Sequence, residues 1–116
     1  MSIEIDVWVR GTANAATHHI GSLPNNPQQW DESHVRQLIT AMLLALNHEK
    51  NPAADAPEVS MRGFSWIVSP YEGGVVIHLE TQTGTASAGP IAIAEEQLSM
   101  LIARVMQPSA TAERIH

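Results

Sequence analysis

Histidine is the residue type in this chain best suited to chemistry, because imidazole binds metals and transfers protons near neutral pH. The chain has six histidines, among them His18, His19, His34, His48 and His78. Metal-binding histidines usually share one face of an element, as in H-x-x-x-H on a helix or H-x-H on a strand. No pair here has such a spacing. We therefore expect no metal site, and ordinary surface or hydrogen-bonded histidines instead.

Nucleophilic catalysis would need an activated serine or cysteine beside a base. The chain contains no cysteine and no G-x-S-x-G motif. Ser65 and His78, which are expected on neighbouring strands, form the best candidate pair, but two polar residues on an exposed sheet face are the simpler interpretation. The glycines of GTASAG and YEGG match no phosphate-binding motif, so turns account for them. The sequence thus predicts no enzyme and no cofactor.

Charge and composition argue against nucleic acid and membrane as direct partners. The formal net charge is -6, and the six Lys and Arg residues form no basic cluster that could bind a phosphate backbone. The first residues, MSIEIDVWVR, do not resemble a secretory signal, and no apolar stretch approaches the roughly 20 residues that cross a bilayer. The lack of cysteine fits a reducing compartment. We expect a cytoplasmic protein.

Two amphipathic helices should position the rest of the chain. The first, residues 31–50 (DESHVRQLITAMLLALNHEK), carries apolar residues at helical spacing. Asp31 suits its N-cap, and Trp30 can pack on Val35 as a hydrophobic staple. The second helix, about residues 94–107, has acidic residues in its first turn and ends before Pro108.

Strand patterns complete a two-layer domain. Residues 2–10 alternate apolar and polar side chains, and residues 59–69 and 74–83 should form a hairpin around a glycine-bearing loop. Residues 84–89 are expected to be small and flexible, 47–58 to be a surface linker, and 11–29 to be a long loop that could add a strand. The prediction is an α+β fold of order β-α-β-β-α, with an antiparallel sheet of three or four strands and two helices on one face. Residues 1–108 form one domain, and residues 109–116 form a disordered tail.

Surplus apolar surface is the main functional clue. On the first helix, Leu44 lies opposite the core stripe. If the helices cover the sheet face that carries Val7 and Ile77, the other face carries apolar side chains too. Apolar patches rimmed by polar groups are typical of protein interfaces, although a core with a few exposed residues would give a similar pattern. The predicted partner-binding residues are Gln37, Ala41, Leu44, His48, Trp8 and Val76.

Four segments, SIEIDVWVR, the 31–50 helix, MRGFSWIVSPYEGGVVIHLE and EEQLSMLIARVM, together resemble the small antiactivators of quorum sensing. This resemblance implies a protein without catalytic residues that binds the ligand-binding domain of a LuxR-type transcriptional regulator and keeps that regulator from dimerising and binding DNA. We expect such an inhibitor to be a homodimer. Two alternatives stay open: an enzyme that binds a small ligand or metal through the open sheet face and the histidines, and an accessory subunit that neutralises a toxin.

Overall fold

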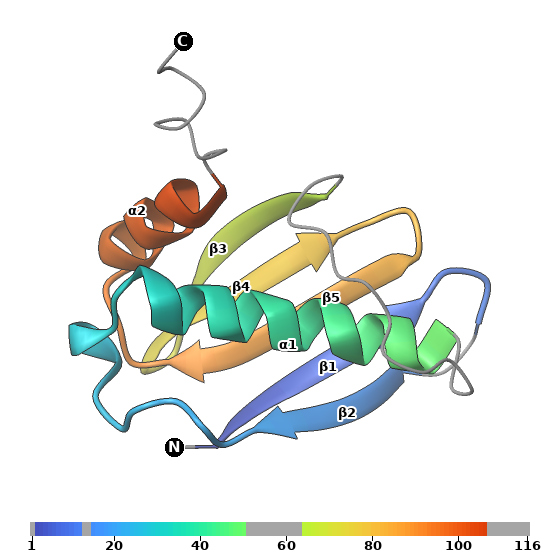
Figure 1. Cartoon of the computed structure of the whole chain (residues 1–116), viewed down its shortest axis with the longest axis horizontal. Coiled ribbons are helices and arrows are strands. Elements are labelled where there is room, and N and C mark those ends of the chain that lie inside the picture. The colour runs from blue at the N-terminus through green and yellow to red at the C-terminus, as the bar shows by residue number, and fades with distance from the viewer. Residues whose placement is uncertain (1, 13–14, 51–63, 107–116) are drawn as a thin grey trace, which may run out of the picture.

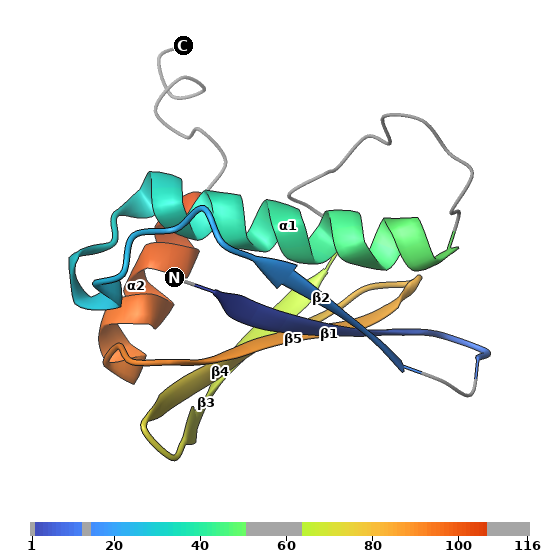
Figure 2. The ribbon, with the colours of Figure 1, turned by 90° about the horizontal axis from the view of Figure 1, so that it is seen from below.

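The computed structural model describes residues 2–12, 15–50 and 64–106, which form an α+β fold of two layers (Figures 1 and 2). The elements in chain order are β1 (Ile3–Val9), β2 (Ala15–Ile20), the 3-10 helix η1 (Pro27–Gln29), α1 (Glu32–Lys50), β3 (Ser65–Tyr71), β4 (Gly74–Glu80), β5 (Gly84–Ile91) and α2 (Glu95–Met106). All neighbouring strands are antiparallel, in the order β2-β1-β5-β4-β3. The predicted fold class is confirmed, but the sheet has five strands, not three or four.

The core lies between the sheet and the helix layer. In β1 the alternation is strict, with Ile3, Ile5, Val7 and Val9 buried. α1 packs on β1 and β5, and α2 packs on α1 and β3 (Figure 2). The helices cover the sheet face that carries Val7 and Ile77, which the sequence pattern had left only as a condition, and Trp8 and Val76 point to the opposite side.

α1 begins where the sequence predicted, because Asp31 caps it. The Oδ1 atom of Asp31 accepts hydrogen bonds from the N–H groups of Ser33, at 2.9 Å, and His34, at 3.2 Å. In return, Nδ1 of His34 accepts the N–H of Asp31 at 3.1 Å, so the N–H groups of Asp31 and His34 are satisfied reciprocally, as in a capping box. Trp30 and Val35 are both buried in the core cluster next to this cap. His34 is thus part of the helix start.

β5 corrects the expectation that residues 84–89 are flexible. It is the central strand, paired with β1 on one side and β4 on the other. Its small residues are required by close packing: a Cβ atom on Gly84 would lie 2.0 Å from the backbone oxygen of Trp8. Ala86 and Ala88 are buried beneath the helix layer, where larger side chains would lift α1 from the sheet. Burial by neighbouring elements therefore outweighs the low strand propensity of this segment.

Residues 11–29 add the strand that the sequence pattern had left open, since β2 pairs back onto β1. The remaining differences concern the ends of elements. β4 ends at Glu80 because Oγ1 of Thr81 accepts the N–H groups of Thr83, at 2.9 Å, and Gly84, at 3.1 Å, which turns the chain into β5. Residues 47–50 belong to α1, whereas the expected linker at 51–58, strand residues 59–63 and tail 109–116 lie outside the described residues. No helix in the described part is long and apolar enough to span a membrane.

Candidate interaction surfaces

The six predicted partner-binding residues fall on two separate surfaces. Trp8 and Val76 lie on the side of the sheet that no described element covers, which we call the open face. The other four, Gln37, Ala41, Leu44 and His48, lie on α1, in the layer on the opposite side of the sheet (Figure 2). The structure therefore does not bring the six residues into one site.

Strand register arranges the open face in rows of opposing side chains. One row runs Ala15, Trp8, Thr85, Glu80 and Ser65, and the next runs Thr17, Asp6, Ser87, His78 and Ile67. Most of these side chains are polar. The two large apolar ones are well exposed, Trp8 by 40% and Ile67 by 59%. Trp8 is anchored because its Nε1–H donates to the backbone oxygen of Thr12 at 2.9 Å.

The histidine of the open face pairs with a serine that the sequence did not indicate. Nδ1 of His78 lies 2.8 Å from Oγ of Ser87, and the pair is part-buried. The predicted partner Ser65 lies opposite Glu80, while His78 lies opposite Ile67 on β3. Ser87 was missed because its segment was expected to be a flexible loop. The sequence did contain one sign of a strand here, because the polar Thr85 and Ser87 alternate with small apolar residues.

A hydroxyl hydrogen-bonded to imidazole is the first requirement of a serine nucleophile, but acyl transfer also needs donors aimed at the developing oxyanion. Ser87 sits in the middle of the central strand, opposite Asp6 on β1 and His78 on β4. The backbone N–H groups of this strand point along the two ladders and are engaged there. They cannot form an oxyanion hole beside Ser87.

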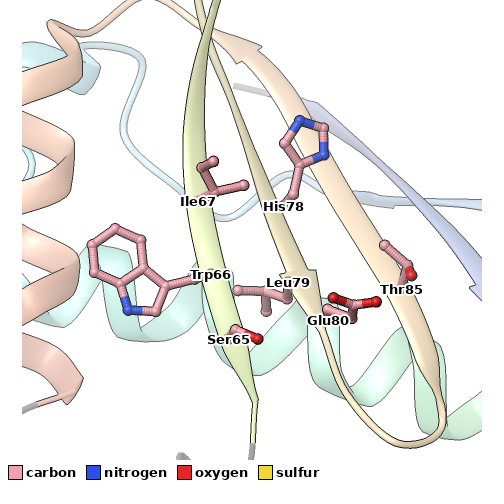
Figure 3. A pocket seen from close by; sticks show the side chains of 7 residues that line it. All are labelled: Ser65, Trp66, Ile67, His78, Leu79, Glu80 and Thr85. Atoms are coloured by element: carbon pink, nitrogen blue, oxygen red, sulfur yellow. The ribbon is translucent and has the colours of Figure 1, made fainter.

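A shallow hollow of about 420 Å³ lies over β3 and β4 (Figure 3). It is lined by Ser65, Trp66, Ile67, His78, Leu79, Glu80 and Thr85. Figure 3 shows Trp66 directed away from His78, on the other side of β3. The hollow thus offers Ile67 as apolar surface beside the imidazole of His78 and the carboxylate of Glu80, a mixture that suits contact with a partner's side chain.

A second depression, of about 370 Å³, separates α1 from the edge strand β2, and we call it the α1–β2 groove. Its lining residues are Ile5, His18, His19, Ala41, Leu44, Ala45 and His48. Leu44 is 38% exposed there, whereas Ala41 is half-buried and packs against the core. Gln37 is exposed nearer to the N-terminal end of α1. Three of the four predicted helix residues therefore border one groove.

Three ionisable side chains meet at one end of this groove. Nε2 of His18 lies 2.8 Å from Oε2 of Glu49, and the His18 and His48 rings meet edge-on with centroids 5.7 Å apart. Within the described residues, no three His, Asp or Glu side chains are arranged to hold a metal ion. The contact between His18 and Glu49 links β2 to the last turn of α1.

No family model matches this sequence, and no curated protein or solved structure is significantly similar to it.

Proposed function

We propose that this protein is a non-catalytic inhibitor that binds a LuxR-type transcriptional regulator in the cytoplasm and keeps it from dimerising on DNA. The observation that supports this proposal best is the open face, where Trp8 and Ile67 are exposed on the side of the sheet opposite the helix layer. Large apolar side chains surrounded by polar ones are the usual anchors of protein interfaces, and tryptophan is prominent among them.

The charge of the open face defines the chemistry of the partner. Glu4, Asp6 and Glu80 are exposed on it, and the whole chain carries a net charge of -6. A complementary partner surface would place Lys or Arg around an apolar centre. If that surface is the one through which the regulator dimerises, binding lowers the concentration of DNA-competent dimer by mass action, without any contact between this chain and DNA.

The direct test is binding of the tagged chain to the isolated ligand-binding domain of a LuxR-type regulator. We expect Ile67→Ser and Trp8→Ser to weaken the complex by about tenfold or more, because each removes an exposed anchor. Met100→Ser is the matched control, since Met100 is 47% exposed on α2, away from the open face. The proposal fails if the open-face variants bind like the parent chain, or if the control weakens binding equally.

Leu44→Asp distinguishes the two surfaces. It places a charge in the α1–β2 groove without touching the open face, so we expect regulator binding to persist. Ala41→Asp is unsuitable as a companion variant, because Ala41 packs against the core and a carboxylate there would destabilise the fold. If Leu44→Asp loses regulator binding while the open-face variants keep it, the regulator binds at the α1–β2 groove.

A small ligand on the open face is a second candidate, favoured by the part-buried His78–Ser87 pair next to the hollow of Figure 3. A ligand that binds only the folded state at 100 times its Kd stabilises that state by about 2.7 kcal/mol. A metabolite or divalent metal with this effect would raise the Tm of the parent chain, and His78→Ala should abolish the rise. If no metabolite or divalent metal raises the Tm of the parent chain, this candidate is excluded.

A further inference from the structure

No described element pairs with or covers the outer edge of β2. β2 is the terminal strand of the sheet (Figure 1), and within the described residues only β1 pairs with it. Its sequence, AATHHI, contains no proline, lysine, arginine or acidic residue, and its register with β1 has no bulge. Natural sheets usually protect such an edge with charge, proline, a bulge or a covering element. An edge without them is suited to pairing with another strand.

The other terminal strand, β3, shows the contrast. Pro70 lies within it and removes a backbone donor, and α2 packs against the strand. The difference in charge is equally relevant, because a chain with a net charge of -6 repels its own copies over most of its surface. β2 carries no Asp, Glu, Lys or Arg, so two β2 strands can approach without repulsion between formal charges on the strands.

We infer that β2 pairs with β2 of a second copy, antiparallel about a two-fold axis, so that one continuous sheet runs through a homodimer. A two-fold interface uses the same surface on both subunits, which fits a single unguarded edge. The α1–β2 grooves of the two copies, each with its exposed Leu44, then lie on either side of the axis. The open face stays free in both copies, so this inference does not depend on regulator binding.

The pleat restricts the register of this pairing. Directly opposed residues of antiparallel strands point to the same face of the sheet, whereas consecutive residues of one strand point to opposite faces. A residue therefore cannot oppose its own neighbour in the second copy, and the two-fold axis must pass beside a residue that opposes the same residue of the other copy. An axis at His18 would oppose two imidazoles, each already held by Glu49 of its own chain. Thr17 is the other residue at the middle of β2, and an axis there opposes two small uncharged side chains and sets Ala16 opposite His18, so we place the axis at Thr17.

A single cysteine tests both the interface and the register. The chain contains no cysteine, so any disulfide formed by Thr17→Cys joins two chains. Opposed Cα atoms in antiparallel strands are about 4.5–5.5 Å apart, within the range that a disulfide spans. We expect Thr17→Cys to form covalent dimers under mild oxidation and Ser65→Cys, on the β3 edge, to remain mostly unlinked. Equal or slower linkage of Thr17→Cys would overturn the inference.

Light scattering on the untagged parent chain supplies the second measurement. We expect twice the mass of one chain at micromolar concentration, and a dimer Kd raised at least tenfold in Thr17→Lys, because two ammonium groups then oppose each other. The fold should survive, since residue 17 is an exposed position of the edge strand. Ser65→Lys is the control. A monomeric parent chain, or a dimer that Ser65→Lys weakens instead, would refute the β2 pairing.

Discussion

Nε2 of His18, on β2, lies 2.8 Å from Oε2 of Glu49, in the last turn of α1. This contact joins the edge strand of the sheet to the helix layer at the end of the α1–β2 groove. Both side chains are about one-third exposed, so solvent screens their interaction considerably. The pair is therefore expected to position β2 against α1 and to contribute modestly to stability.

A double-mutant cycle with His18→Ala and Glu49→Gln measures this contribution. We expect a coupling energy of about 0.2–1 kcal/mol in urea unfolding, reduced at high salt. The comparison is the pair Arg104 and Glu32, whose atoms are 3.7 Å apart and whose side chains are roughly half exposed. That pair should couple more weakly. A stronger coupling there would show that the His18 contact has no special role.

The two isoleucines Ile77 and Ile67 report on the two faces of the sheet. Ile77 is fully buried beneath the helices, so Ile77→Ala should cost about 2–5 kcal/mol in free energy of unfolding. Ile67 is 59% exposed on the open face, and Ile67→Ala should change stability by about 0.5 kcal/mol or less. Urea denaturation of both variants checks the assignment. Similar losses would mean that the open face is covered in solution.

Gly84 should tolerate no side chain, because an added Cβ would lie 2.0 Å from the backbone oxygen of Trp8. We expect Gly84→Ala to force β1 and β5 apart and to cost about 3 kcal/mol. The control is Gly73→Ala, whose methyl group meets open space and whose positive φ alone costs about 1–2 kcal/mol. Thermal unfolding of both variants gives the comparison. A smaller loss at residue 84 would contradict the close β1–β5 approach.

The cap of α1 predicts a pH dependence. The side-chain hydrogen bond from Ser33, together with the backbone N–H of His34, lowers the pKa of Asp31 below its ordinary value. A lowered pKa means that this stabilisation is present above the ordinary aspartate value, about 4, and is lost as the pH falls through the folded-state pKa. Asp31→Ala should therefore lower the Tm at pH 7, and this difference should shrink in acid.

Asp31→Asn is the control for that experiment. Asparagine keeps an oxygen that can accept the two N–H groups at the helix start, so it should retain much of the stability at pH 7 without the pH dependence. A loss in Asp31→Ala that is the same at pH 7 and in acid would contradict the charged cap.

Local patterns were sufficient for the elements whose side chains alternate or repeat clearly. The alternation from Ile3 to Val9 gave both β1 and its buried face, and Asp31 gave the start of α1. From these two elements the exposure of Trp8 followed directly. β2 and β5 were harder, because Ala, Ser, Thr and Gly carry little strand signal of their own. Their strand conformation depends on the neighbours that bury or pair with them.

The candidate site was predictable only as far as single strands allow. Alternation placed Val76 and Trp8 on one face only on the condition that the helices cover Val7 and Ile77, whereas the partner of His78 depends on the register between β4 and β5. Once β5 was taken for a loop, Ser87 could not be placed. The separation of the predicted helix residues from the predicted sheet residues likewise follows from tertiary packing, which puts α1 on the far side of the sheet from Trp8.

The ladder between β1 and β5 joins the first and the last of the described strands, as the pairing of Val9 with Gly84 shows. During synthesis the hairpin of β1 and β2 must wait until β5 has been made before its inner edge is paired. Contacts so distant in sequence slow folding and leave strand edges open to other chains in the meantime. Production of this protein should therefore be more sensitive to translation rate and temperature than its small size suggests.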